Sequence, residues 1–112
     1  MPNMRLRTLL IIAALSALPV AGQQEKEGAK DAASLFHQQC AGCHGADGKA
    51  QTFIGKRVHA ADLTSQAVQQ QTDAALSEII HSGKGKMPAF GSKLSDPDIQ
   101  SLLAYVRQLG AK

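Results

Sequence analysis

The stretch Cys40-Ala41-Gly42-Cys43-His44 decides the fold expected for this 112-residue chain. It has the C-x-x-C-H spacing at which two thiols bond to the vinyl groups of a haem, and the histidine is then placed to bind the iron. The two cysteines are three residues apart, so on a helical turn they face the same way. The stretch therefore predicts one covalently attached haem c, with Cys40, Cys43 and His44 as candidate site residues.

Three other interpretations of the cysteine pair are weaker. A zinc site needs two more ligands, but the chain has no third cysteine, and His37, His59 and His81 are scattered singly. A thioredoxin-like redox pair should follow a β-strand, whereas residues 31–39 look helical. A structural disulfide across so short a loop would constrain little. Haem attachment is favoured mainly because the histidine directly follows the second cysteine.

The first 22 residues have the outline of a secretory signal peptide. Arg5 and Arg7 form a basic start, residues 9–18 an apolar stretch, and residues 19–22 a small-residue end. The apolar stretch is shorter than the ~20 residues of a membrane-spanning helix. We therefore expect cleavage rather than an uncleaved anchor, a periplasmic location, and no stable membrane insertion afterwards.

Composition limits the function of the mature chain. About 90 residues make one small domain with a thin core, and only three Phe, one Tyr and no Trp are available to fill it. The formal charge is +3, but loss of Arg5 and Arg7 leaves ten basic against nine acidic side chains. Without the basic stripe of a nucleic-acid-binding protein, we expect no nucleic-acid partner, and we expect a monomer.

The mature chain shows helical periodicity and no β-strand alternation, so the expected fold class is all-α. Residues 23–30 are polar and are expected to form a flexible leader, and residues 31–112 the single domain. Capping residues and apolar periodicity locate the expected helices. They are residues 31 to about 40, 65–70, 72–83 and 95–110.

Residues 46–63 show no sustained period and are expected to form a loop. The glycines that precede and open this stretch break regular structure. The loop carries Phe53, Ile54 and Val58, which could pack against the haem.

Met87 is the only methionine left after signal removal, in the run Gly83-Lys-Gly-Lys-Met-Pro-Ala-Phe90. Glycines let such a loop approach a flat ligand, and Pro88 stiffens it. A lone methionine is more often core filling, but this one lies between two expected helices. We therefore predict Met87 as the second axial ligand, ahead of His59 and His81. A His/Met pair raises the reduction potential and closes the iron to substrate, which favours electron transfer over turnover.

Over residues 32–110 the chain resembles the class I c-type cytochromes. The matching elements are C-A-G-C-H at 40–44, M-P-A-F at 87–90 and the last expected helix. The resemblance implies the cytochrome c fold, in which three to four helices surround one covalently bound haem. It implies that the first and last helices cross, with Phe36 and Tyr105 at the crossing. It also implies a carrier of single electrons between redox partner proteins, not an enzyme, whose haem is attached outside the cytoplasmic membrane.

The chain departs from this family pattern at two places. Ala32 stands where the family usually has a glycine. The family often has a proline after the haem motif whose carbonyl orients the histidine ligand, but no proline occurs between His44 and Met87. Another carbonyl, near Phe53 to Gly55, is expected to take this role.

Lysines flank the Met87 loop and are candidate docking residues for acidic partners, where their charge would raise the encounter rate. They are Lys84, Lys86 and Lys93. For each lysine taken singly, a solvated surface position without a docking role is an equally good interpretation. The alternative function is a haem peroxidase or a gas or redox sensor with a displaceable sixth ligand. Its distal groups would then be Lys56, Arg57 and His59.

Overall fold

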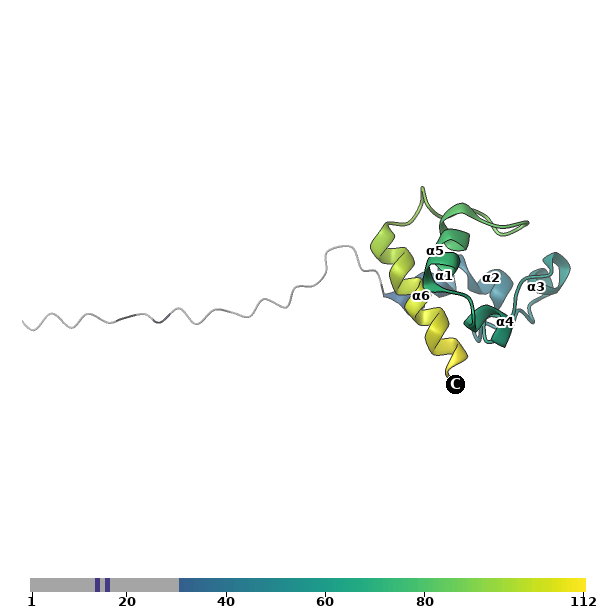
Figure 1. The fold of residues 1–112 in the computed structure, drawn as a ribbon, viewed down its shortest axis with the longest axis horizontal. Coiled ribbons are helices and arrows are strands. Elements are labelled where there is room, and N and C mark those ends of the chain that lie inside the picture. The colour runs from purple at the N-terminus through teal and green to yellow at the C-terminus, as the bar shows by residue number, and fades with distance from the viewer. Residues whose placement is uncertain (1–13, 15, 17–30) are drawn as a thin grey trace, which may run out of the picture.

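A computed structural model describes residues 31–112, together with Ala14 and Ser16. The expected signal peptide (1–22, apart from those two residues) and leader (23–30) lie outside the described residues. Figure 1 shows the helical segments of the described part. They are α1 (Ala32–Gln39), α2 (Ala41–His44), α3 (Phe53–Val58), α4 (Gln66–Gln69), α5 (Asp73–Ser82) and α6 (Asp96–Gly110). The all-α class is confirmed, since the described residues form no strand, only an isolated bridge between Lys84 and Met87.

The expectation of a loop over residues 46–63 is wrong, because α3 lies within it. Thr52 begins this helix, and its hydroxyl accepts the backbone N–H of Gly55 at 2.8 Å. A helix of six residues spans less than two turns, so it is too short to show an apolar period in the sequence. Two of the other segments, α2 and α4, are single turns of four residues, which raises the number of segments above the expected three to four.

The two longest helices begin where their capping residues predict. The hydroxyl of Thr72 accepts the N–H of Ala75 at the start of α5. At the start of α6, Ser95 and Asp98 each accept the other's backbone N–H in a capping box. Each such cap stabilises the helix by about 1 kcal/mol, because it satisfies donors that have no partner within the helix.

The core forms where α1 and α5 pack against α6. The rings of Phe36 and Tyr105 meet with their centroids 5.0 Å apart, which confirms the expected aromatic contact between the first and last helices. Phe36 is fully buried. The other buried members of this cluster are Leu35, Phe90, Leu94, Ile99, Leu102, Val106 and Leu109. No helix of the described residues is both long and apolar enough to cross a membrane.

Arg107 ties α6 to the segment that joins α4 and α5. Its guanidinium donates to the carbonyl oxygens of Gln69 at 2.8 Å and Gln71 at 2.6 Å. It also donates to the carboxylate of Asp73 at 2.8 Å. Gln71 lines the cavity described next, so this clamp helps to hold one wall of the cavity.

Candidate functional site

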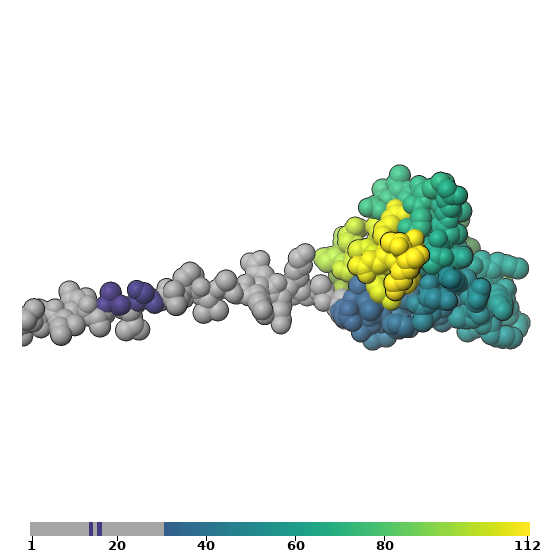
Figure 2. Space-filling model, turned by 90° about the horizontal axis from the view of Figure 1, so that it is seen from below, coloured from purple at the N-terminus to yellow at the C-terminus, as the bar shows by residue number. Residues whose placement is uncertain are grey.

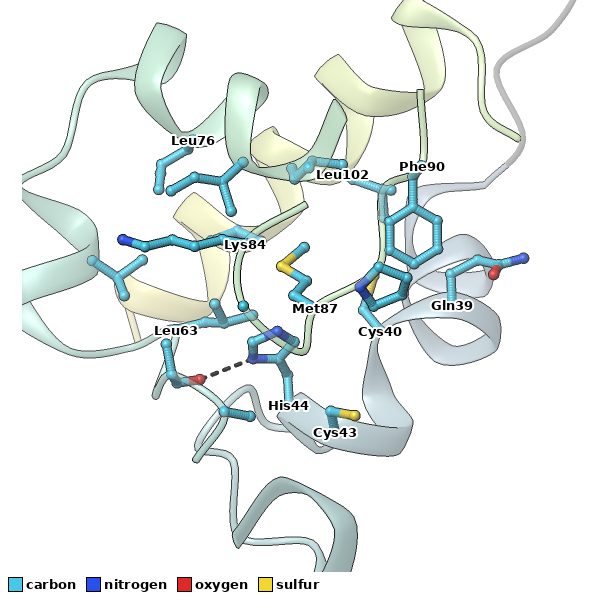
Figure 3. Close-up of a pocket in the computed structure, with 18 of the residues that line it drawn as sticks. Gln39, Cys40, Cys43, His44, Leu63, Leu76, Lys84, Met87, Phe90 and Leu102 are labelled. Atoms are coloured by element: carbon cyan, nitrogen blue, oxygen red, sulfur yellow. Dashed lines mark hydrogen bonds between the residues drawn. The ribbon is translucent and has the colours of Figure 1, made fainter. Parts of the chain in front are cut away.

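An apolar cavity of about 390 Å³ lies inside the domain. This volume is within the range of ~300–1,000 Å³ found for ligand and cofactor sites. Side chains from α4, α5 and α6 form one wall, and the Met87 loop and α2 face it (Figure 3). The apolar wall includes Leu63, Val68, Leu76, Ile79, Leu102 and Leu103. Water finds few hydrogen-bond partners on such a surface, so the cavity favours a large apolar ligand over water.

The structure brings all four predicted site residues together at this cavity. Cys40, Cys43, His44 and Met87 all line it, although Met87 is separated from the others by more than forty residues of sequence. Figure 3 shows the His44 ring and the Met87 side chain facing the same hollow. A pair of thiols, an imidazole and a thioether around an apolar cavity fits a covalently attached haem with two axial ligands.

Cys40 and Cys43 lie on a tight turn between α1 and α2. Both are partly buried, and they form no disulfide with each other. The backbone N–H groups of Cys43 and His44 donate to the carbonyl oxygen of Cys40, which closes the turn. Burial raises the pKa of the Cys40 thiol to about 11, so this thiol is protonated at neutral pH when nothing is attached to it.

Thr52 and Gly55 hold this turn from the side of α3, a role that the sequence analysis missed. The Thr52 hydroxyl lies 2.8 Å from the carbonyl oxygen of Gly42 and 3.0 Å from that of Cys43. Gly55 lets α3 approach closely, because a Cβ atom there would overlap the carbonyl oxygen of Cys43. A threonine followed three residues later by glycine is too common a pattern to have indicated this contact.

The imidazole of His44 is oriented by a backbone carbonyl. Its Nδ1 atom lies 2.9 Å from the carbonyl oxygen of Ala61, drawn as the dashed line in Figure 3. A carbonyl oxygen can only accept, so Nδ1 carries the proton, and the Nε2 lone pair is left for a metal. The expectation of a carbonyl near Phe53 to Gly55 is therefore wrong. Those residues belong to α3, whose N-terminal end meets the carbonyl of Cys43 instead.

The residues after Ala61 form a turn that supports this carbonyl. The carboxylate of Asp62 accepts the backbone N–H of Thr64 at 2.8 Å and its hydroxyl at 2.7 Å. These hydrogen bonds hold the pKa of the Asp62 carboxyl below its usual value. The turn thus fixes the backbone next to the Ala61 carbonyl, which accepts the hydrogen bond from His44.

The Met87 loop is held by its own backbone and by α5. Lys84 and Met87 exchange backbone hydrogen bonds of 3.2 and 2.9 Å. Gly83 has a φ of +76°, and a Cβ atom on it would lie 2.7 Å from the carbonyl oxygen of Met87. The N–H of Phe90 donates to the carbonyl of Ile80 at 3.0 Å. These contacts position Met87 over the cavity.

Other predicted groups are divided between the cavity and the surface. Val58 and His59 line the cavity, but Phe53 and Ile54 do not: their side chains are 80% and 51% exposed, so their predicted haem contact is wrong.

His81 is exposed and is not among the lining residues; its ring lies against Gly91. His37, Lys56 and Arg57 are exposed and also outside the cavity lining. Lys84 and Lys86 lie at the cavity rim, and the ammonium of Lys93 is 5.7 Å from the Phe90 ring centroid.

Residues 27–106 match the protein family described as "Cytochrome C oxidase, cbb3-type, subunit III". The chain is 34% identical over 96 residues to the FixP subunit of the cbb3-type cytochrome c oxidase of Azorhizobium caulinodans, an alignment that covers 84% of this chain and 31% of that protein. The chain thus spans less than a third of the length of the two cbb3-type subunits that it matches.

Smaller proteins match over most of their length. The chain is 39% identical over 72 residues to cytochrome c6 of Leptolyngbya boryana, covering 64% of this chain and 81% of that protein. The solved structure of the c-type cytochrome KustC0563 superposes with a TM-score of 0.66 at 29% identity, covering 71% of this chain and 98% of that one.

Proposed function

Because this chain belongs to the class I c-type cytochromes, in the family described as cytochrome c oxidase, cbb3-type, subunit III, we propose that it carries one electron on a single haem c. Its role as a haem c electron-transfer protein follows from this family. The number of haems rests on the sequence, which contains one C-x-x-C-H motif, at Cys40 to His44. Bound haem c supplies a one-electron couple at its iron. The residues of the chain supply attachment, orientation and an apolar surrounding.

The observation that carries the finer proposal is the meeting of His44 and Met87 at one apolar cavity. We assign His44 as one axial ligand, since the Ala61 carbonyl holds its Nδ1 proton and leaves Nε2 for iron. We assign Met87 as the other. A thioether ligand raises the reduction potential, because it favours Fe(II). Attachment is assigned to Cys40 and Cys43.

With both axial positions taken by side chains, no position is left for a substrate, and we propose no catalytic residue. The alternative, a peroxidase or sensor with a displaceable sixth ligand, would use Lys56, Arg57 and His59 as its distal groups. Lys56 and Arg57 lie outside the cavity lining, and His59 reaches the lining from an exposed position. This arrangement favours the carrier.

Membership of this family implies redox partner proteins. We propose that Lys84, Lys86 and Lys93, all exposed beside the Met87 loop, steer acidic partners toward the protein and so raise the encounter rate. Added salt should then slow reduction by the physiological donor. We further propose that the protein is a monomer without a nucleic-acid partner.

We propose a periplasmic location on the basis of the signal-like residues 1–22, with residues 31–112 as the haem domain. Cleavage would remove Met1 and Met4 and leave Met87 as the only methionine. Mass spectrometry of the mature protein tests this directly, since one haem and the loss of about 22 residues shift the mass in opposite directions.

A redox titration followed by absorption spectra tests the proposed function. A single one-electron transition, with the spectrum of a low-spin iron in both states, is the expected result. A high-spin ferric spectrum, or binding of peroxide or carbon monoxide at neutral pH without prior loss of a ligand, would contradict it and favour the alternative. A haem stain after denaturing electrophoresis tests covalent attachment.

A further inference from the structure

We propose that the exposed side of α3 is the contact surface for a redox partner protein that presents carboxylates around an apolar centre. This surface, called here the α3 tip, consists of Phe53, Ile54, Lys56 and Arg57. The proposal rests on the electron-transfer function proposed above.

The α3 tip carries an unusual pair of exposed apolar side chains. Phe53 is 80% and Ile54 51% exposed, and they are the exposed large hydrophobic side chains of the described part of the chain. They are adjacent in the first turn of α3, which lies at one end of the domain in both views (Figure 1, Figure 2). Single exposed apolar residues are ordinary. Two large neighbours at a protruding end would lose unfavourable water contact if a partner covered them.

The charges around this pair indicate the chemistry of the partner. From Gly48 to Ala61 the sequence has three cations, Lys49, Lys56 and Arg57, and no carboxylate. Lys49 lies close enough to Asp62 to help lower the pKa of that carboxyl. The two cations of the tip, Lys56 and Arg57, are exposed, and neither forms an ion pair within residues 31–112. An apolar contact flanked by unpaired cations is complementary to an apolar centre with an acidic rim.

The α3 tip is joined directly to the turn that holds the cysteines. Thr52, the residue before Phe53, contacts the carbonyl oxygens of Gly42 and Cys43, and Gly55 packs against the same Cys43 carbonyl. A partner that covers the tip therefore lies beside the turn to which haem attachment is assigned. This favours a redox protein over a lipid surface, on which two side chains would give only weak binding.

The test uses the haem-loaded protein and an acidic plastocyanin as the probe. The reduced protein gives one electron to Cu(II), which leaves Fe(III) in the protein and Cu(I) in the probe, with no other bond made or broken. The variant Phe53→Ser/Ile54→Ser removes the apolar contact at positions exposed enough for folding to be unaffected. The control variant Lys84→Glu/Lys86→Glu changes charge at the rim of the cavity, beside Met87.

The two variants should respond differently to salt. We expect Phe53→Ser/Ile54→Ser to lower the second-order rate by about threefold to tenfold at both low and high salt, since an apolar contact is not screened. We expect Lys84→Glu/Lys86→Glu to lower it by about tenfold at low salt only, as steering requires. The spectrum, the reduction potential and the rate with ferricyanide should stay at wild-type values in the serine variant.

Two results would overturn the proposal. One is a serine variant that reacts with plastocyanin at the wild-type rate at every salt concentration. The other is wild-type binding to phosphatidylglycerol vesicles that the serine variant loses, which would assign the tip to a membrane surface. Failure of the proposed function is distinguishable, because the wild type would then lack haem or a reversible one-electron transition.

Discussion

The hydroxyl of Thr52 lies 3.0 Å from the carbonyl oxygen of Cys43 and joins α3 to the turn that carries both cysteines. The same hydroxyl accepts the N–H of Gly55, so it serves the helix start and the turn together. A single side chain thus connects the attachment turn to the segment that presents the proposed docking surface.

Replacing Thr52 by valine should weaken both connections. The change removes the N-cap of α3 and the hydrogen bond to the turn, which together predict a loss of about 1–3 kcal/mol in the free energy of unfolding. Guanidinium unfolding of the haem-loaded protein measures it. Thr52→Ser keeps the hydroxyl and should retain most of the stability; equal stability of the valine and serine variants would contradict the assigned role.

Met87→Ala should abolish the absorption band near the red edge that is characteristic of methionine bound to ferric haem. It should also lower the reduction potential, since a thioether favours Fe(II). His81→Ala is the matched control, because His81 is exposed and lies outside the cavity lining. Survival of the band in Met87→Ala would show that Met87 is not the ligand.

Gly83 and Gly85 offer a matched pair in the Met87 loop. Both have positive φ, at +76° and +57°, but only a Cβ atom on Gly83 would meet the backbone of Met87, while nothing lies within 4 Å of one on Gly85. In each alanine variant, backbone strain should lower the free energy of unfolding by about 1 kcal/mol. Gly83→Ala should lose about 1–3 kcal/mol more through overpacking and should weaken the methionine band. A normal band in Gly83→Ala would show that this glycine does not position Met87.

Arg107→Met should destabilise the protein far more than Asp73→Asn. Arg107→Met leaves the carbonyls of Gln69 and Gln71 without their charged donor. This should lower the free energy of unfolding by about 1.5–3 kcal/mol. Asp73 is 73% exposed, so its ion pair with Arg107 should contribute less than about 1 kcal/mol. Thermal or guanidinium unfolding separates the two, and equal losses would mean that the ion pair, not the carbonyl contacts, holds α6 to this segment.

Stability should depend on pH through Asp62. Its pKa in the folded protein is below the ordinary value of 3.8, because Thr64 donates to its carboxylate. The ionised form is therefore the one that the fold stabilises. That contribution is complete above the ordinary pKa and is lost as pH falls through the lower folded pKa. The stability advantage of wild type over Asp62→Asn should shrink over this acid window, and a constant difference from pH 7 downward would contradict it.

Features encoded within one helical turn were predictable from the sequence. The caps of α5 and α6 at Thr72 and Ser95 are examples, since the cap hydroxyl accepts a backbone N–H only three residues further along the chain. The short helix α3 was not, although its cap Thr52 also acts within one turn, because its six residues include the poor helix former Gly55 and follow a glycine-rich stretch. The outward direction of Phe53 and Ile54 was not predictable either, since apolar side chains in a presumed loop beside a haem motif are expected to turn inward.

The C-x-x-C-H motif at 40–44 and Met87 could be identified from the sequence alone, because the chemical identity and spacing of these residues mark them. Their meeting at one apolar cavity, and the identity of the carbonyl that orients His44, depend on the tertiary structure. Every residue offers the same backbone carbonyl, so the choice of Ala61, 17 residues away, follows from packing. Thr52, Gly55 and the Asp62 turn set that packing, and none of them stands out in the sequence.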